Sequence, residues 1–197
     1  MIRFFDFIFS LISLIFLMPL FIILAVLIKL DSKGPVLFKQ IRVGKDGKDF
    51  TLFKFRSMFI NAEQGGLITV GERDPRITKI GYFLRKYKID ELLQLVNVLI
   101  GDMSFVGPRP EVPRYVKLYS SEQRKILTVK PGITDYASIY FIHENELISK
   151  SNNPEKTYIT VILPAKINYN MIFINNQTVS EYFKIILLTI RKLIFKF

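Results

Sequence analysis

The sequence predicts an α+β fold in which an N-terminal membrane helix leads into a body of one β-hairpin and several helices. Two observations predict it. Residues 7–28 form a run of 22 residues without a charge. After residue 31 the pattern changes to strand-like segments and then to segments of helical period. We therefore expect two parts, a membrane helix over residues 1–30 and a membrane-associated body over residues 31–197.

Composition limits the chemistry that this chain can perform. It has 197 residues, 28 Lys and Arg against 17 Asp and Glu, a formal net charge of +11 and no Cys. Disulfides, thiolate metal sites and cysteine nucleophiles are therefore excluded. A strongly basic chain favours phosphate-bearing partners, which include nucleotides, nucleic acids and anionic lipids.

The apolar run from Phe7 to Ile28 would be about 33 Å long as a helix, which is enough to cross the hydrocarbon core. It is longer than the apolar core of a signal peptide and no cleavage site follows, so we expect it to be retained. Pro19 predicts a bend, and the bent helix either crosses the membrane or returns to the same side. Only Arg3 of the 28 cations precedes the run, which places residues 29–197 in the cytoplasm in both cases.

Residues 36–43 and 50–56 predict a β-hairpin closed by Gly44 to Gly47. Strand alternation puts Lys54 and Arg56 on one face. That face is either solvated or a site for an anion.

Two helices are predicted next. Asp74 as N-cap and Pro75 at the first position begin one helix, and a second runs from Asp90-Glu91 to Gly101. The adjacent carboxylates are explained either by capping or by catalysis. In the catalytic reading, Asp90 stays ionised at the helix N-terminus and nearby cations hold a phosphate close to it.

Arg109 lies between Pro108 and Pro110 in the loop that follows. Prolines on both sides restrict the backbone, so the guanidinium would lose little entropy on binding. This loop is either a phosphate clamp or a structural turn.

Three stretches together resemble the bacterial sugar transferase family, the small monotopic phosphoglycosyl transferases. They are GPVLFKQIRVGKDGKDFTLFKFRSM, DPRITKIGYFLRKYKIDELLQLVNVLIGDMSFVGPRP and KPGIT, behind an apolar helix with a central proline. The resemblance covers roughly residues 1–135, and its motifs are specific in combination.

The resemblance implies a transfer in two steps with Asp90 as nucleophile and Glu91 as its catalytic partner. Asp90 would take the sugar phosphate from a UDP-sugar, releasing UMP, and undecaprenyl phosphate would then accept it to start glycan assembly. Glu91 and Asp90 would bind Mg²⁺. The cations implied to bind phosphate are Lys54, Arg56, Arg85 and Arg109.

The resemblance also favours a re-entrant membrane helix, broken at Pro19, with both ends and the catalytic body on the cytoplasmic face of the bacterial inner membrane. The family has Ser before this proline, whereas this chain has Met18. The hydroxyl that would satisfy a freed carbonyl at the break is therefore absent.

The last third of the chain departs from the commoner family pattern after Thr134, where Asp135 stands in place of Gly. This region is expected to help select the sugar. His143 is expected to be a structural residue. Residues 180–197 predict an amphipathic helix at the membrane interface, with a buried core helix as the alternative.

Two other classes of function remain open. One is a membrane-tethered basic protein that binds nucleic acid or anionic lipid without catalysis, and the other is an anchoring subunit. No nucleic-acid module is recognisable in the sequence, so we expect no nucleic-acid partner. Substituting Asp90→Asn distinguishes the classes, because binding through charge would survive it.

Overall fold

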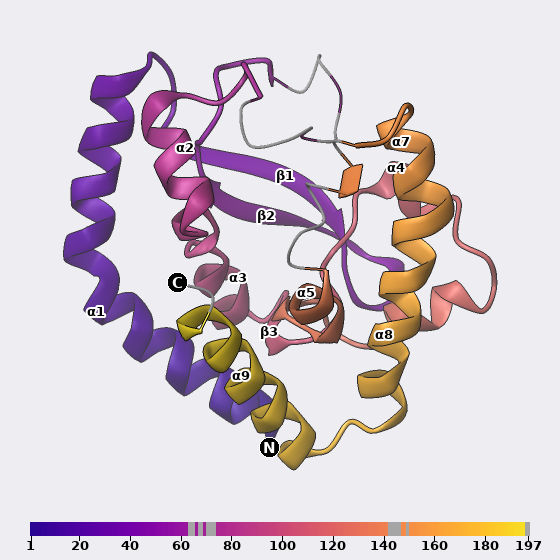
Figure 1. Ribbon diagram of the computed structural model, residues 1–197. Helices are drawn as coiled ribbons and strands as arrows, with labels where there is room; N and C mark the ends of the chain where they lie inside the picture. The colour runs from indigo at the N-terminus through magenta and orange to yellow at the C-terminus, as the bar shows by residue number, and fades with distance from the viewer. Residues whose placement is uncertain (63–65, 67–68, 70–73, 142–146, 149, 196–197) are drawn as a thin grey trace.

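The computed structural model describes residues 1–62, 66, 69, 74–141, 147–148 and 150–195, so His143 lies outside the described residues. The long helix α1 runs along one side of a body that contains the hairpin β1–β2 and the shorter helices (Figure 1). The predicted α+β architecture with a long N-terminal apolar helix is confirmed.

Helix α1 (Ile2–Asp31) is continuous, with Pro19 inside it, and its axis bends along its length (Figure 1). The most apolar window of this helix has a mean hydropathy of 3.1. By length and composition, the helix could cross a membrane. Most of its side chains face away from the body. The buried ones lie toward the two ends of the helix and are Asp6, Ser10, Leu24 and Ile28.

Both ends of α1 are tied to the body by polar contacts. Near the N-terminus, the buried Asp6 carboxylate accepts hydrogen bonds from Ser104 Oγ at 3.0 Å and Tyr182 OH at 2.8 Å. At the other end, Asp31 Oδ2 accepts one from Ile80 N at 3.0 Å. The apolar middle of α1 is thus the part that the body leaves uncovered.

The predicted hairpin is confirmed. Strands β1 (Leu37–Val43) and β2 (Asp49–Phe55) pair antiparallel with Leu37 opposite Phe55, and the short η1 (Lys45–Gly47) closes the turn. Leu52 packs with α3 and Met103 on one side, whereas Phe55 packs with α1 and α2 on the other. Packing on both faces therefore fixes the position of β2.

The predicted start of the first helix is wrong. Helix α2 (Lys79–Lys86) begins after Thr78, whose side chain accepts a hydrogen bond from Gly81 N at 2.9 Å. The Asp74 carboxylate instead accepts hydrogen bonds from the backbone N of Arg76, at 3.0 Å, and from the Arg76 guanidinium. A local turn and ion pair thus use the carboxylate that the sequence offered as a cap.

The second predicted helix begins as a 3₁₀ turn. After Lys88 in the left-handed region (φ 58°), η3 (Ile89–Glu91) carries the two carboxylates and α3 (Gln94–Ile100) follows. Gly101 ends α3 with a φ of 99°, which confirms the predicted stop.

The arginine loop and the KPGIT segment lie side by side. Strand β3 (Ser104–Val106) pairs parallel with β4 (Gly132–Thr134). A Cβ on Gly132 would lie 2.1 Å from Gly107 N, so this approach requires glycine. The pairing places the segment after β4 directly behind the arginine loop.

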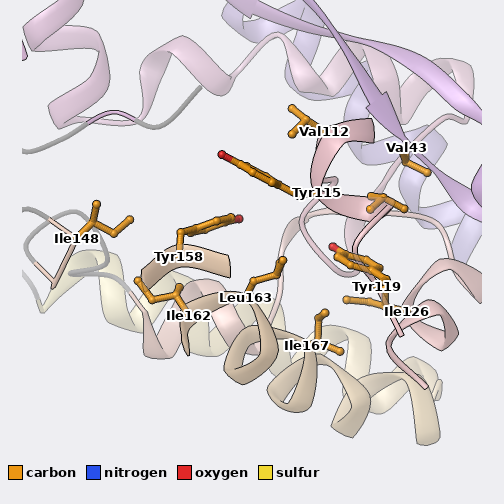
Figure 2. Close-up of a cluster of buried hydrophobic side chains, with 11 residues drawn as sticks. Val43, Val112, Tyr115, Tyr119, Ile126, Ile148, Tyr158, Ile162, Leu163 and Ile167 are labelled. Carbon is orange, nitrogen blue, oxygen red and sulfur yellow. The ribbon is translucent and has the colours of Figure 1, made fainter. Parts of the chain in front are cut away.

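Among the remaining helical elements, those over residues 113–116, 123–128, 158–162 and 163–175 contribute to a core of buried Tyr, Ile, Leu and Val side chains (Figure 2). The Tyr115 and Tyr158 rings lie 5.3 Å apart in it. The helical elements are α4 (Pro113–Val116), η4 (Gln123–Thr128), α5 (Tyr136–Tyr140), α7 (Pro154–Thr157), the π-helical η5 (Tyr158–Ile162), α8 (Leu163–Asn175) and α9 (Val179–Ile194).

Helix α9 corresponds to the amphipathic helix predicted at the C-terminus. Thr178 caps it by accepting a hydrogen bond from Glu181 N at 3.2 Å. Tyr182 and Ile185 are buried against the body. Four apolar residues of α9 remain exposed, so the body covers the helix on one side only; they are Leu187, Ile190, Leu193 and Ile194.

Candidate functional site

Three segments distant in sequence meet at the Glu91 carboxylate. Lys54 Nζ, from the end of β2, lies 2.8 Å from Oε1. The Arg109 guanidinium, from the loop after β3, donates to both oxygens, with Nη1 3.0 Å from Oε2. A forked guanidinium on a carboxylate is a geometrically specific pair. The structure thus brings together three of the predicted site residues.

The two cations determine the ionisation of Glu91. Burial alone would raise the pKa of Glu91, but the charges of Arg109 and Lys54 and the Arg109 hydrogen bond lower that pKa well below its usual value. Burial in turn lowers the pKa of Lys54, although the Glu91 charge opposes this shift. Glu91 is therefore a fixed anion near neutral pH.

Asp90 lies next to this cluster in a different environment. Its side chain is 5% exposed, and no side chain caps η3 or α3, so the capping role is not seen. Burial and the neighbouring Glu91 charge raise the pKa of Asp90, against the charges of Lys54, Arg85 and Lys88. We had expected the helix N-terminus to keep this pKa low. Burial is the larger effect because η3 is a single turn.

Arg85, in the last turn of α2, is near enough to Asp90 for its charge to act on that carboxylate. Its Nη2 donates to Thr69 Oγ1 at 2.9 Å. Lys88 also acts on Asp90, from the link between α2 and η3. Cations from two sides thus surround a carboxylate that is not itself held in an ion pair among the described residues.

Arg56 does not join this group. Its guanidinium donates to the carbonyls at the end of α1, with Nη1 2.6 Å from Lys33 O and Nη2 2.7 Å from Ser32 O. Arg56 lies one residue beyond β2 and caps α1 instead of facing Asp90. The expectation that it binds phosphate beside Lys54 therefore has no support in its placement.

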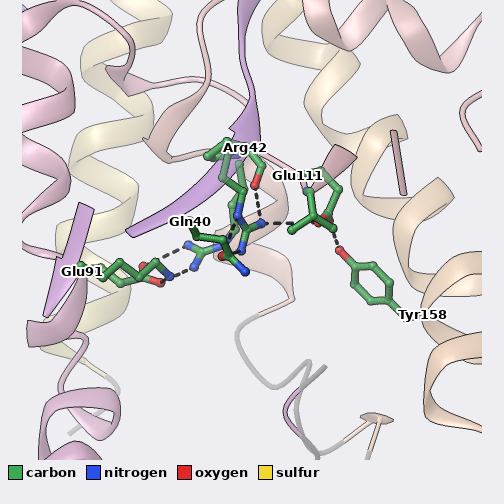
Figure 3. A network of polar contacts seen from close by, with 9 residues as sticks. Gln40, Arg42, Glu91, Glu111 and Tyr158 are labelled. Carbon is green, nitrogen blue, oxygen red and sulfur yellow. Dashed lines mark hydrogen bonds and ion pairs between the residues drawn. The ribbon is translucent and has the colours of Figure 1, made fainter. Parts of the chain in front are cut away.

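A second polar network, which the sequence did not indicate, adjoins the site. Arg42 of β1 lies between the Glu91 cluster and the Glu111–Tyr158 pair (Figure 3). It donates to Gln40 Oε1 at 2.6 Å and to Pro110 O at 2.8 Å. Nothing in the alternation of β1 distinguishes Arg42 from a solvated strand cation. Its contact with Pro110 O supports the loop that carries Arg109.

The site offers two carboxylates to a metal ion. Within the described part of the chain, no group of three or more His, Asp or Glu side chains is placed to hold a metal. Both Glu91 oxygens accept hydrogen bonds from cations. Hard carboxylate oxygens suit Mg²⁺, which is often held by one or two carboxylates together with substrate phosphates. The donor chemistry therefore fits Mg²⁺ as an ion that arrives with a phosphate ligand.

The family model described as bacterial sugar transferase matches residues 1–196. The chain therefore belongs to the bacterial sugar transferase family, which confirms the resemblance seen in its motifs. The match continues through the C-terminal helices, beyond the roughly 135 residues that carried that resemblance.

Three relatives illustrate the sugars for which similar proteins are named and the extent of the match. The chain is 37% identical over 190 residues to a UDP-glucose:undecaprenyl-phosphate glucose-1-phosphate transferase of Klebsiella pneumoniae, covering 95% of this chain and 38% of the relative. It is 34% identical to the Escherichia coli enzyme of the same name over 95% of this chain and 39% of that enzyme. A UDP-N-acetylgalactosamine-undecaprenyl-phosphate N-acetylgalactosaminephosphotransferase of Aeromonas hydrophila is 48% identical over 61% of this chain and 29% of its own length. The chain thus spans less than two fifths of each.

The ion pairs of Glu91 predict a pH-dependent contribution to stability. Folding lowers the pKa of Glu91, so the ionised carboxylate stabilises the folded protein. This contribution to the free energy of unfolding is fully present above the ordinary glutamate pKa of about 4.3. It is lost as the pH falls through the lower pKa of Glu91 in the folded protein. Glu91→Gln leaves Lys54 buried beside a neutral amide. We expect a loss of about 1–3 kcal/mol at pH 7 that shrinks on acidification, measured by thermal unfolding in detergent.

The matched control is Glu122→Gln. Glu122 pairs with Lys125, but its side chain is 80% exposed, so we expect no change in the unfolding temperature. An unfolding temperature of Glu91→Gln equal to that of the wild type at pH 7 would contradict this account of the cluster.

Proposed function

We propose that this chain transfers a sugar 1-phosphate from a UDP-sugar to undecaprenyl phosphate, releasing UMP, as an early step of glycan assembly. Family membership and the activities for which the relatives are named support this function. The single structural observation that carries it is Asp90, a buried carboxylate without a capping role beside a second carboxylate held by two cations.

Asp90 is the proposed nucleophile because its environment makes it more basic than an ordinary aspartate. A raised pKa makes a carboxylate a stronger base and, in its ionised form, a stronger nucleophile. Glu91 contributes to this by its fixed negative charge. The two carboxylates also differ in their partners, because Glu91 is bound to Lys54 and Arg109 in the absence of substrate.

The transfer takes place in two displacements. An Asp90 oxygen attacks the β-phosphorus of the UDP-sugar, and the bond from that phosphorus to the bridging oxygen breaks, so UMP leaves with the electron pair. The product is an acyl phosphate, in which the sugar phosphate is joined through phosphorus to the Asp90 carboxylate oxygen. A phosphate oxygen of undecaprenyl phosphate then attacks the same phosphorus, and Asp90 leaves as a carboxylate.

Lys54, Arg85 and Arg109 are the proposed phosphate ligands. An anionic nucleophile approaches a diphosphate only when the charge of the diphosphate is neutralised. Arg85 and Lys54 act on Asp90, and Arg109 reaches its neighbour Glu91. Glu91 and Asp90 are the residues proposed to hold Mg²⁺, which when bound would supply further positive charge to the phosphates.

The proposed topology of α1 is re-entrant, with both ends in the cytoplasm. It is supported by the contacts of Asp6 near one end and of Asp31 near the other with the same body. A helix that crossed the membrane would carry Asp6 to the opposite side from Ser104 and Tyr182. In this arrangement the exposed apolar middle, which includes Phe16, enters the bilayer.

Helix α9 is proposed to lie in the membrane interface beside α1. The two helices are joined by aromatic contacts, with the Phe5 and Phe183 rings 5.2 Å apart. The exposed apolar face of α9 and its cations Lys184, Arg191 and Lys192 suit the boundary between acyl chains and anionic headgroups. The body is proposed to lie on the cytoplasmic face of the bacterial inner membrane, in line with the excess of cations after the apolar run.

Asp90→Asn tests the proposed nucleophile. We expect transfer to fall by about a thousandfold or more, because the amide cannot form the acyl phosphate intermediate. The variant should remain folded, since burial favours a neutral side chain at this position. UMP release is measured with purified protein, Mg²⁺ and undecaprenyl phosphate over a panel of UDP-sugars.

Asp46→Asn is the matched control for this experiment. Asp46 is exposed in the hairpin turn with a φ of 58°, a conformation that asparagine tolerates, so its activity should equal that of the wild type. Full transfer by folded Asp90→Asn would refute the proposed function as a covalent transferase.

The pH dependence of kcat/KM follows from the two shifted groups of the free enzyme. Because the pKa of Asp90 is raised, the acid limb should lie above the ordinary aspartate value of about 3.9. Because the pKa of Lys54 is lowered, the alkaline limb should lie below the ordinary lysine value of about 10.4. Lys54→Arg should move only the alkaline limb, to higher pH, whereas Lys48→Arg in the exposed turn should move neither.

The topology of α1 is tested by single cysteines, for which this chain is convenient because it has none. Phe4→Cys and Lys33→Cys, both exposed, should react with an impermeant maleimide in inverted vesicles and not in intact spheroplasts. Ser120→Cys marks the body. Labelling of Phe4→Cys from outside the spheroplasts would instead establish a spanning helix.

A further inference from the structure

Asp135, the residue that departs from the commoner family pattern, is 2% exposed and lies directly behind the arginine loop. Its Oδ2 accepts hydrogen bonds from Arg109 N at 2.9 Å and from Asn170 Nδ2 at 2.8 Å. Its Oδ1 accepts one from Ser138 N at 2.5 Å, which caps α5. One carboxylate therefore joins the loop, α5 and α8.

The contact with Arg109 holds the main chain of a residue whose side chain is part of the site. Arg109 N donates to Asp135, and the carbonyl of the next residue, Pro110, accepts from Arg42 Nη1 at 2.8 Å. The backbone around Arg109 is thus fixed from two sides. The guanidinium can then reach both oxygens of Glu91.

Asn170 connects this arrangement to the C-terminal helices. It lies on α8, is buried, and accepts a hydrogen bond from Ala137 N at 3.4 Å while it donates to Asp135. Asp135 is therefore oriented by its own partner. A buried carboxylate with three donors is strongly fixed, because each donor would otherwise be left without an acceptor.

We propose that Asp135 is a positioning residue for the transfer: it holds the backbone of Arg109 so that the guanidinium fork meets Glu91 and the donor phosphates. This inference rests on the proposed function for its effect on catalysis. Its structural part, the fixing of Arg109 by Asp135, can be measured without any activity.

Asp135→Asn separates positioning from capping. An asparagine still offers one oxygen to Ser138 N, and Asn is a good N-cap. Its amide nitrogen then faces Arg109 N and Asn170 Nδ2, so donors meet donors. Asp135→Ser is the second variant, because a serine hydroxyl can cap α5 but is too short to reach Arg109 N.

The first measurement is hydrogen exchange on the purified full chain. A peptide that covers residues 107–110 contains only two amide hydrogens in this segment, those of Gly107 and Arg109, because the other two residues are prolines. Exchange at Arg109 should become faster in both Asp135 variants. Asn153→Ala, which removes the comparable cap of α7, should leave this peptide unchanged. Unchanged exchange in the Asp135 variants would overturn the proposal.

The second measurement is a double-mutant cycle in UMP release. We expect Asp135→Asn to lower kcat by about tenfold or more, with a smaller change in the KM of the UDP-sugar. In an Arg109→Lys background, which lacks the forked guanidinium, Asp135→Asn should lower kcat much less. Equal losses in both backgrounds would show a general structural effect and overturn the proposal. If the wild type transfers no sugar from any donor, the proposed function fails, and hydrogen exchange alone decides the role of Asp135.

Discussion

The Glu91 carboxylate, held between Lys54 and Arg109, is the interaction on which the rest of this site depends. Each partner comes from a separate part of the chain: the hairpin, the 3₁₀ turn and the loop after β3. Removal of Glu91 would leave Lys54 and Arg109 without their shared carboxylate, and removal of either cation would leave Glu91 with one counterion instead of two. The three segments therefore fix one another. The order of the site is a property of the whole body and not of the turn that carries the two carboxylates.

The same cluster explains how neighbouring carboxylates acquire opposite properties. Glu91 has two cations in direct contact, so its pKa falls, whereas Asp90 has burial and a neighbouring anion, so its pKa rises. Two titratable groups with divergent environments are typical of a division of catalytic roles. Two of the proposed phosphate ligands, Lys54 and Arg109, are already gathered at Glu91 before any substrate is present. A diphosphate that binds here would compete with Glu91 for Lys54 and Arg109 and need not recruit cations from solvent.

Local patterns predicted the elements that depend on local chemistry. The hairpin followed from alternation and a glycine-rich turn, and Gly101 ended α3 as a left-handed C′ residue. Asp90, Glu91 and Arg109 were predicted as site residues because their motifs are specific in combination, and the structure places Arg109 on Glu91. The failures have one physical cause, which is that a polar side chain takes whichever partner the tertiary fold brings to it. Asp74 found Arg76, and Arg56 found the end of α1, neither of which is visible in the spacing.

The polar contacts at the two ends of α1 give the proposed membrane arrangement a physical basis. Asp6 is buried and accepts hydrogen bonds from hydroxyl groups of β3 and α9. Moving its carboxylate into hydrocarbon, away from these donors, would cost several times the free energy of burying one unpaired neutral polar group. The helix therefore gains by keeping its ends on the body and placing only its apolar middle in lipid. In that geometry the bilayer surface lies against α1 and α9, on the body that carries Asp90. Transfer in two displacements requires that donor and acceptor reach the same carboxylate in turn. In this arrangement, Asp90 is accessible to a donor dissolved in the cytoplasm and to an acceptor whose phosphate lies at the membrane surface.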